Sequence, residues 1–188
     1  TLGPAGRLVI GVAGESGSGK SITAASLAQT LNGRGVSTTT IHQDDYFILP
    51  PRTNHEQRLI DLAHVGPHEV DLARIRAHIA AFRQGRDVND APLVDYPSNR
   101  FIVQTLHLAG CDVLVVEGTY VLNLPEIDVR VFLEATHEDS RQRRRERNRD
   151  IDHPVIDAIL GIEHDIIAPQ REHAHIVIDR HFAIHRVA

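Results

Sequence analysis

The sequence predicts one three-layer α/β/α domain built on a five-stranded parallel sheet. Short apolar runs rich in β-branched residues alternate along the chain with runs whose apolar residues have helical spacing. One of these runs, 112–117, is almost wholly apolar, which is typical of a central parallel strand. At 188 residues the chain fits a single domain with a substantial core. We expect this domain to span 1–188, after a loose leader at 1–6.

The expected elements follow one another in order. Predicted strands lie over 8–13, 35–42, 112–117, 129–133 and 175–178. Predicted helices lie over 21–31, 70–82, 140–149 and 156–167. The sequence shows no internal repeat and no interdomain linker.

A glycine-rich loop joins the first predicted strand to the first predicted helix. Residues 14–21 read Gly-Glu-Ser-Gly-Ser-Gly-Lys-Ser, a complete G-x-x-x-x-G-K-[ST] phosphate-binding motif in its strand–loop–helix setting. Its glycines let backbone N–H groups point inward at phosphate oxygens, and the dipole of the following helix favours the same anion. Lys20 is the one lysine of the chain, whereas every other cationic side chain apart from histidine is an arginine. An ammonium group is a compact charge that can reach between two phosphates.

These features predict binding of a nucleoside triphosphate, which we take to be ATP, with Mg²⁺. Ser21 would give its hydroxyl to the metal ion. The expected nucleotide-binding residues are Gly14, Glu15, Ser16, Gly17, Ser18, Gly19, Lys20, Ser21 and Ile22.

Two acidic positions follow predicted strands at the carboxyl edge of the sheet, where open α/β sheets bind ligands. Glu117 ends its apolar strand and is a candidate for holding Mg²⁺ directly or through water. Asp44 and Asp45 follow the second strand, where a carboxylate could accept the proton of an attacking hydroxyl. Because neighbouring side chains diverge, the residues alone do not decide which aspartate faces the site.

A predicted helix at 140–149 carries six arginines, of which Arg141, Arg145 and Arg149 share one face. We expect a lid over about 136–153 that closes over the nucleotide, with Arg141 and Arg145 stabilising charge on the transferred group. A solvated basic face and a nucleic-acid contact are the alternatives.

The composition of the chain limits the kinds of partner that it can have. The net charge is −5, which does not favour nucleic acid as a partner, and no apolar stretch reaches the length of a membrane span. A single cysteine excludes an internal disulfide, as in proteins of a reducing compartment such as the cytoplasm. We therefore expect a small-molecule substrate, no nucleic acid and no membrane, and the sequence leaves a homo-oligomer open.

The glycine loop, the Gln43–Phe47 segment, the Val115–Gly118 strand end and the arginine-rich helix occur in the order seen in the uridine kinase-like branch of P-loop kinases. The chain resembles that branch, which includes nicotinamide riboside kinases and is related to phosphoribulokinase and bacterial pantothenate kinase. The resemblance covers most of residues 7–180.

The resemblance implies roles for several residues. Asp44 would be the general base and would lie with Ser21 and Glu117 near the metal ion. The residues expected around the acceptor substrate are Asp44, Tyr46, Tyr96, Asn99 and Arg100.

The chain departs from its relatives where they contact pyrimidine and ribose. Val94 and Asn99 stand where uridine kinases carry a tyrosine and a histidine, and the ribose-holding segment is altered over 61–67. We expect an ATP-dependent kinase that phosphorylates the 5′-hydroxyl of a nucleoside. The alternatives are a kinase for another alcohol, such as nicotinamide riboside or a sugar phosphate, and a nucleotide-dependent switch or assembly protein.

Overall fold

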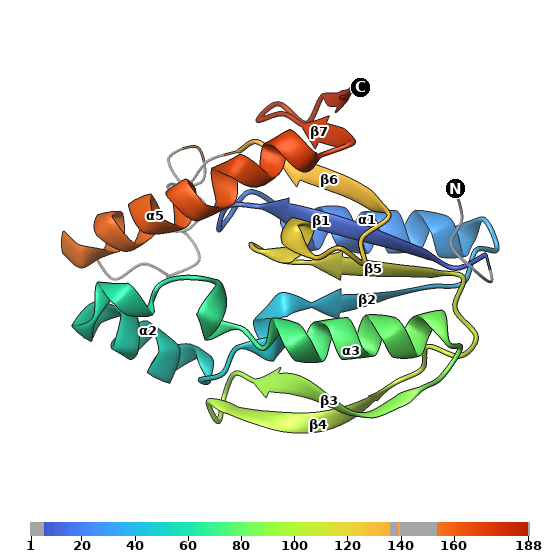
Figure 1. Ribbon diagram of the computed structural model, residues 1–188, viewed down its shortest axis with the longest axis horizontal. Helices are drawn as coiled ribbons and strands as arrows, with labels where there is room; N and C mark the ends of the chain where they lie inside the picture. Colours follow the sequence, from blue (N-terminus) through green and yellow to red (C-terminus); the bar gives the residue numbers. More distant parts are fainter. Residues whose placement is uncertain (1–5, 136–138, 140–153, 188) are drawn as a thin grey trace.

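A computed structural model describes residues 6–135, 139 and 154–187. Its main sheet has six strands in the order β2-β5-β1-β6-β7-β8, and all neighbouring pairs are parallel except β7 and β8 (Figure 1). The strands are β1 (Leu8–Gly14), β2 (Thr38–His42), β5 (Val113–Glu117), β6 (Val129–Leu133), β7 (Ile176–Ile178) and β8 (Ile184–Arg186). The five predicted parallel strands are confirmed, and β8 adds a sixth, antiparallel strand.

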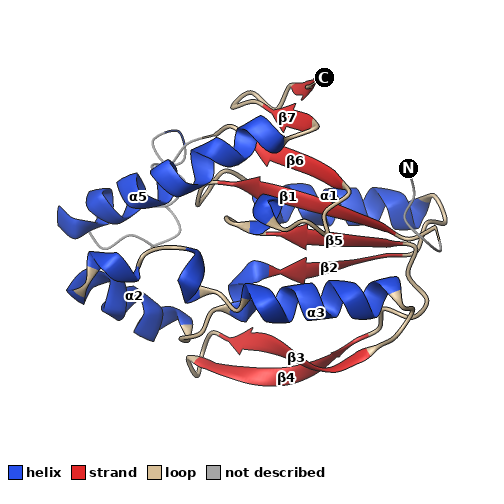
Figure 2. Ribbon diagram, viewed as in Figure 1, coloured by secondary structure: helices blue, strands red, loops and turns tan. Residues whose placement is uncertain are grey.

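Helices cover both faces of this sheet, which confirms the three-layer prediction (Figure 2). Alternate residues of β1 point to opposite faces because the side-chain period of a strand is two. Val9 packs with α3 (Leu72–Arg83) and with the end of α5 (Pro154–Ile167), whereas Ile10 packs on the other face, with α1 (Lys20–Gly33). The strands are therefore apolar on both faces, as central parallel strands must be.

A second, two-stranded sheet was not predicted from the sequence. It consists of β3 (Val88–Asp95) and β4 (Arg100–Leu106), which pair antiparallel beside α3 (Figure 1). Pro92 within β3 obscures the strand pattern, because proline is confined to positions where no ladder hydrogen bond is lost.

Helix α2 (Pro51–Ile60) was also not predicted from the sequence. The strands β3 and β4 form a hairpin, and the turn of this hairpin is hydrogen-bonded to the first residues of α2. The Arg52 N–H donates to Asn99 Oδ1 at 2.9 Å, and the Arg52 guanidinium donates to the Pro97 carbonyl at 3.0 Å. Pro51 at the first helical position suits a helix start.

The predicted lid helix over 140–149 lies outside the described residues, as do Arg141 and Arg145. Among the helices that the structure describes, none is long and apolar enough to span a bilayer.

Candidate active site

The glycine loop adopts a conformation that requires its glycines. Gly14, Gly17 and Gly19 have φ values of 152°, 79° and 104°, which L side chains rarely adopt. A Cβ atom on Gly14 would also lie 2.7 Å from the carbonyl oxygen of Leu133. The loop between β1 and α1 therefore forms a tight turn that a bulkier sequence could not make.

Polar groups inside this loop fit a bound phosphate chain. The Lys20 ammonium donates to the Glu15 carbonyl at 2.9 Å, and the Ser18 N–H donates to the same oxygen at 3.1 Å. The Ser18 hydroxyl is fully buried and has no hydrogen-bond partner among the described residues. A buried hydroxyl without a partner, beside an ammonium group and the amino end of a helix, can donate a hydrogen bond to a bound anion.

The carboxylate of Glu15 points away from this phosphate cradle toward α5. Its Oε1 lies 2.7 Å from His164 Nδ1, and Glu15 is buried. An acidic side chain inside a phosphate-binding loop would repel its ligand if it faced inward, so this arrangement directs the negative charge elsewhere. Ile22, which was also predicted to contact the nucleotide, lies on α1 with 63% of its surface exposed.

The predicted metal-binding pair is assembled at the adjoining ends of β5 and α1. Ser21 Oγ donates to Glu117 Oε1 at 3.0 Å, and His42 Nδ1 lies 2.8 Å from the same oxygen. Burial opposes ionisation of Glu117, but the bond to His42 and the charge of Lys20 outweigh it and hold the pKa of Glu117 below its ordinary value. The bond to Glu117 in turn raises the pKa of His42, against the effect of burial. An ionised carboxylate beside a hydroxyl is a donor set that suits Mg²⁺.

The two neighbouring aspartates have different surroundings. Asp45 is buried, and its Oδ1 accepts the N–H of Val94 on β3 at 2.8 Å. Asp44 is exposed. Gln43, between β2 and these aspartates, is fully buried and bonds the Tyr120 N–H and the Thr119 hydroxyl, both at 2.9 Å. The chain after β2 is thereby fixed against the chain after β5, with Asp45 turned toward the hairpin and Asp44 toward solvent.

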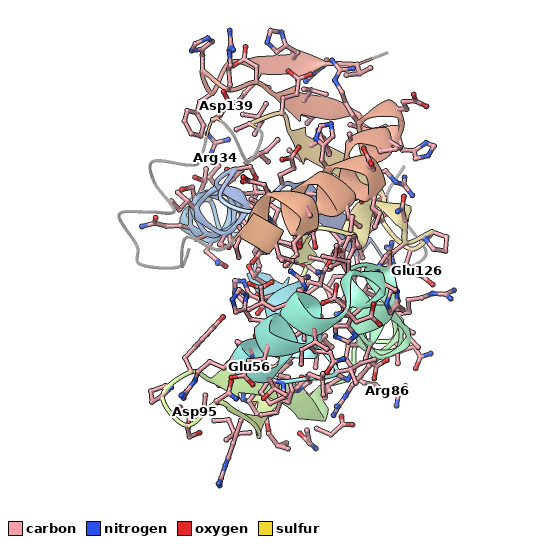
Figure 3. All side chains as sticks on the ribbon, turned by 90° about the vertical axis from the view of Figure 1, so that its left-hand side faces the viewer. Arg34, Glu56, Arg86, Asp95, Glu126 and Asp139 are labelled. Carbon is pink, nitrogen blue, oxygen red and sulfur yellow. The ribbon has the colours of Figure 1, made fainter. Side chains whose placement is uncertain are left out.

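The expected acceptor residues are only partly brought together. Tyr46 is 3% exposed and its hydroxyl bonds His78 Nδ1 at 2.8 Å, so it packs in the core, and its contact with an acceptor stays a prediction. Asn99 has a φ of 52° and uses its side chain to hold α2 through Arg52 and Thr53. Tyr96 and Arg100 are exposed near the hairpin turn. Figure 3 looks at this end of the molecule, with Glu56 of α2 and Asp95 of β3 below α5.

Sequence reasoning missed a buried charge cluster between α2 and α5. The Arg58 guanidinium binds both oxygens of Glu69, at 2.5 and 3.0 Å, and contacts Glu163 Oε1 at 2.9 Å. Glu69 is fully buried and Glu163 nearly so. The three residues are spread over more than 100 positions, so no local spacing indicates the cluster.

A pocket of about 450 Å³ lies on the other side of α5, beside the glycine loop. Its lining includes Glu15, Leu133, His164, Arg171 and His181. Glu15 belongs to the glycine loop and also lines this pocket. A ligand whose phosphates bind at the loop could therefore extend into the pocket.

Comparison with known proteins gives a consistent picture. Residues 9–184 match the model of a family described as the phosphoribulokinase/uridine kinase family. A uridine kinase from Macrococcus caseolyticus is 30% identical over 184 residues, which cover 90% of this chain and 86% of that protein. A bifunctional alpha-galactosidase/sucrose kinase from Mediterraneibacter gnavus is 29% identical over 188 residues, which cover 93% of this chain; the chain spans only 20% of that relative's length.

Two solved structures have the same fold. One is of a possible uridine kinase from Bacillus stearothermophilus, with a TM-score of 0.67 at 21% identity, covering 94% of this chain and 91% of that one. The other is phosphoribulokinase from Rhodobacter spheroides, with a TM-score of 0.70 at 16% identity, covering 92% of this chain and 70% of that one.

Proposed function

The chain belongs to the phosphoribulokinase/uridine kinase family of ATP-dependent phosphotransferases, and on that premise we propose that it transfers the γ-phosphoryl group of ATP to the 5′-hydroxyl of a nucleoside. One observation carries the proposal that the acceptor is an alcohol. Asp44, at the exit of β2, is exposed at the same sheet edge as the Ser21–Glu117 pair, because β2 and β5 are parallel neighbours in the sheet. A carboxylate there could take the proton of a hydroxyl that attacks the terminal phosphate.

Each part of the site has a role in this reaction. The loop amides and Lys20 hold the phosphates and fix their position. Ser21 and Glu117 would hold Mg²⁺, which when bound would neutralise charge on the phosphates. Asp44 accepts the proton of the acceptor hydroxyl. Asp45 fastens the hairpin to the exit of β2 through Val94 and so supports the acceptor side of the site.

Tyr96 favours a nucleoside as the acceptor. It lies at the hairpin turn with 56% of its surface exposed and could offer an aromatic face to a base. The site would then distinguish bases mainly by stacking. Val94 has no polar side-chain group, and the Asn99 side chain is already hydrogen-bonded to Arg52 and Thr53 of α2.

A sugar is the second candidate acceptor. The Asn99 side chain is bonded to α2 and Val94 is apolar, so the hairpin has few polar groups that could recognise a base. A sucrose kinase is among the relatives, although the chain corresponds to a fifth of that protein.

Acceptor-dependent ATP consumption tests both candidates. ADP release would be followed with uridine, cytidine, guanosine, nicotinamide riboside, sucrose and fructose, each against a reaction without acceptor. A nucleoside kinase shows at least one nucleoside with a kcat/KM well above those of the sugars. A switch or assembly protein would show a slow rate that no acceptor changes.

A further inference from the structure

Glu69 and Glu163 lie in the same buried cluster, but their hydrogen-bonding capacity is used very differently. Both oxygens of Glu69 are saturated: they accept from Arg58 twice, from Asn54 Nδ2 at 2.7 Å and from the Gly66 N–H at 2.6 Å. Among the described residues, the Glu163 carboxylate makes one polar contact, from the Arg58 guanidinium to its Oε1. Glu163 therefore keeps unused acceptor capacity at a site where only 6% of the residue is exposed.

The charges of the cluster do not balance. One guanidinium faces two carboxylates, and Glu69 takes the bidentate geometry, which is the stronger arrangement. Burial outweighs the attraction of Arg58 and Lys20 and raises the pKa of Glu163, with a smaller contribution from the charge of Glu69. A largely buried carboxylate that shares one cation with a second carboxylate is costly to ionise, so a purely structural role would favour a neutral residue here.

Glu163 also lies close to the phosphate loop. It sits on α5 opposite α2, and the charge of Lys20 acts on it, which places it between the phosphate loop and the helix that carries the hairpin. Tyr120 adds a second polar group to the cluster, with a buried hydroxyl that has no hydrogen-bond partner among the described residues. Two incompletely used polar groups in one cluster favour a ligand rich in hydroxyl groups.

We infer that the Glu163 carboxylate binds hydroxyl groups of an uncharged acceptor, other than the hydroxyl that is phosphorylated. In a nucleoside these are the 2′- and 3′-hydroxyls. A hydroxyl can donate to the spare lone pairs of Glu163, whereas a phosphorylated or carboxylated acceptor would bring a further negative charge to a cluster in which, among the described residues, one guanidinium contacts two carboxylates. This inference rests on the proposed function and narrows its acceptor to neutral polyhydroxylated molecules.

The test compares two substrates in two enzymes. Uridine and 2′,3′-dideoxyuridine share the 5′-hydroxyl and differ only in the hydroxyls assigned to Glu163. Because a hydrogen bond to a charged group is worth roughly a 10- to 100-fold change in binding, the wild type should have a kcat/KM for uridine higher than that for the dideoxy analogue by about this factor. In Glu163→Gln the ratio should fall to within about threefold of unity, through a higher KM for uridine with the KM for ATP unchanged.

The ratio separates binding from a structural effect. A variant that merely loosened the fold would slow both substrates alike and leave the ratio unchanged, which would overturn the inference. Asp165→Asn, an exposed change two positions along α5, is the matched control and should preserve the wild-type ratio. Turnover of ribulose 5-phosphate at least as fast as that of uridine would also overturn it. Absence of any acceptor-dependent turnover would instead overturn the proposed function, and the inference with it.

Discussion

Ser21 Oγ donates a 3.0 Å hydrogen bond to Glu117 Oε1, and this bond joins the start of α1 to the end of β5. The two residues are 96 positions apart, yet both belong to short motifs at the carboxyl edge of one parallel sheet. The register explains the proximity: β1 and β5 are adjacent and parallel, with Val12 beside Glu117, so the chain leaving β1 turns into α1 next to the end of β5. The proximity of these two predicted metal-binding residues is thus a direct consequence of strand order.

Lys20→Ala should lower kcat/KM by roughly a thousandfold or more, because it removes a principal charge on the transferred phosphoryl group. No other lysine exists in the chain to replace it. Steady-state ADP release is the measurement. Arg34→Ala, at the exposed far end of α1, is the control and should change the rate by less than about twofold. Near-normal turnover of Lys20→Ala would contradict the site.

Asp44→Asn should nearly abolish phosphoryl transfer while ATP still binds, because an amide cannot accept the hydroxyl proton. Asp45→Asn should be milder, since an amide oxygen can still accept the Val94 N–H. Turnover and calorimetric ATP binding would be measured on both variants. The reverse order of effects would show that Asp45 is the base.

Most of the main sheet could be predicted from the sequence because its signals are local. A run such as Val113–Glu117 has an apolar pattern that no surface element would carry, and the glycine loop marks the turn from β1 into α1. The pairing of β7 with β8 has no such signal: Ile184–Arg186 is three exposed residues long.

The candidate site could be predicted where chemistry is local and not where it depends on packing. Lys20, Ser21 and Glu117 are identifiable from motif and strand-end position. The resemblance places Tyr46 at the acceptor, but its ring direction depends on His78 of α3, which spacing does not indicate. The Arg58–Glu69–Glu163 cluster likewise arises where α2, α5 and the turn at Pro67–Glu69 meet, and no local sequence pattern indicates it.

Arg58→Gln should destabilise the fold by about 3–5 kcal/mol, because it leaves two buried carboxylates without their cation. Urea unfolding gives the free energy of unfolding. Arg76→Gln is the matched control: it removes the pair with Glu126, in which the Arg76 side chain is half exposed, and should cost less than about 1 kcal/mol. Equal, small effects of the two changes would show that the buried cluster is dispensable for stability.

Glu163 should make stability fall as pH rises. Its pKa is raised in the folded protein, chiefly by burial, so the folded state binds more protons than the unfolded state above the ordinary pKa of a glutamate. The stability that this group contributes is therefore present at low pH and is lost as pH rises through the folded pKa. Around it stand Arg58, Lys20 and Glu69, with Tyr120 neutral.

Glu163→Gln should remove that dependence, because a glutamine does not titrate. The difference in the free energy of unfolding between variant and wild type would be measured by urea unfolding from about pH 5 to about pH 8, a range above the ordinary pKa of a glutamate. It should shift in favour of the variant as pH rises. A difference that stayed constant, or shifted toward the wild type, would contradict the raised pKa.

Uridine preference should be weak. Val94 offers a base no hydrogen bond, and the Asn99 side chain is committed to Arg52 and Thr53, so the hairpin lacks polar groups for reading a pyrimidine. A site that hydrogen-bonds its substrate can reject analogues by large factors, whereas an apolar wall discriminates by only about 10- to 200-fold for each methylene-sized difference. In competition assays, uridine and cytidine should fall within about tenfold of at least one non-pyrimidine acceptor in kcat/KM, a gap that an apolar contact can produce. A thousandfold advantage for uridine would show that residues other than these recognise the base.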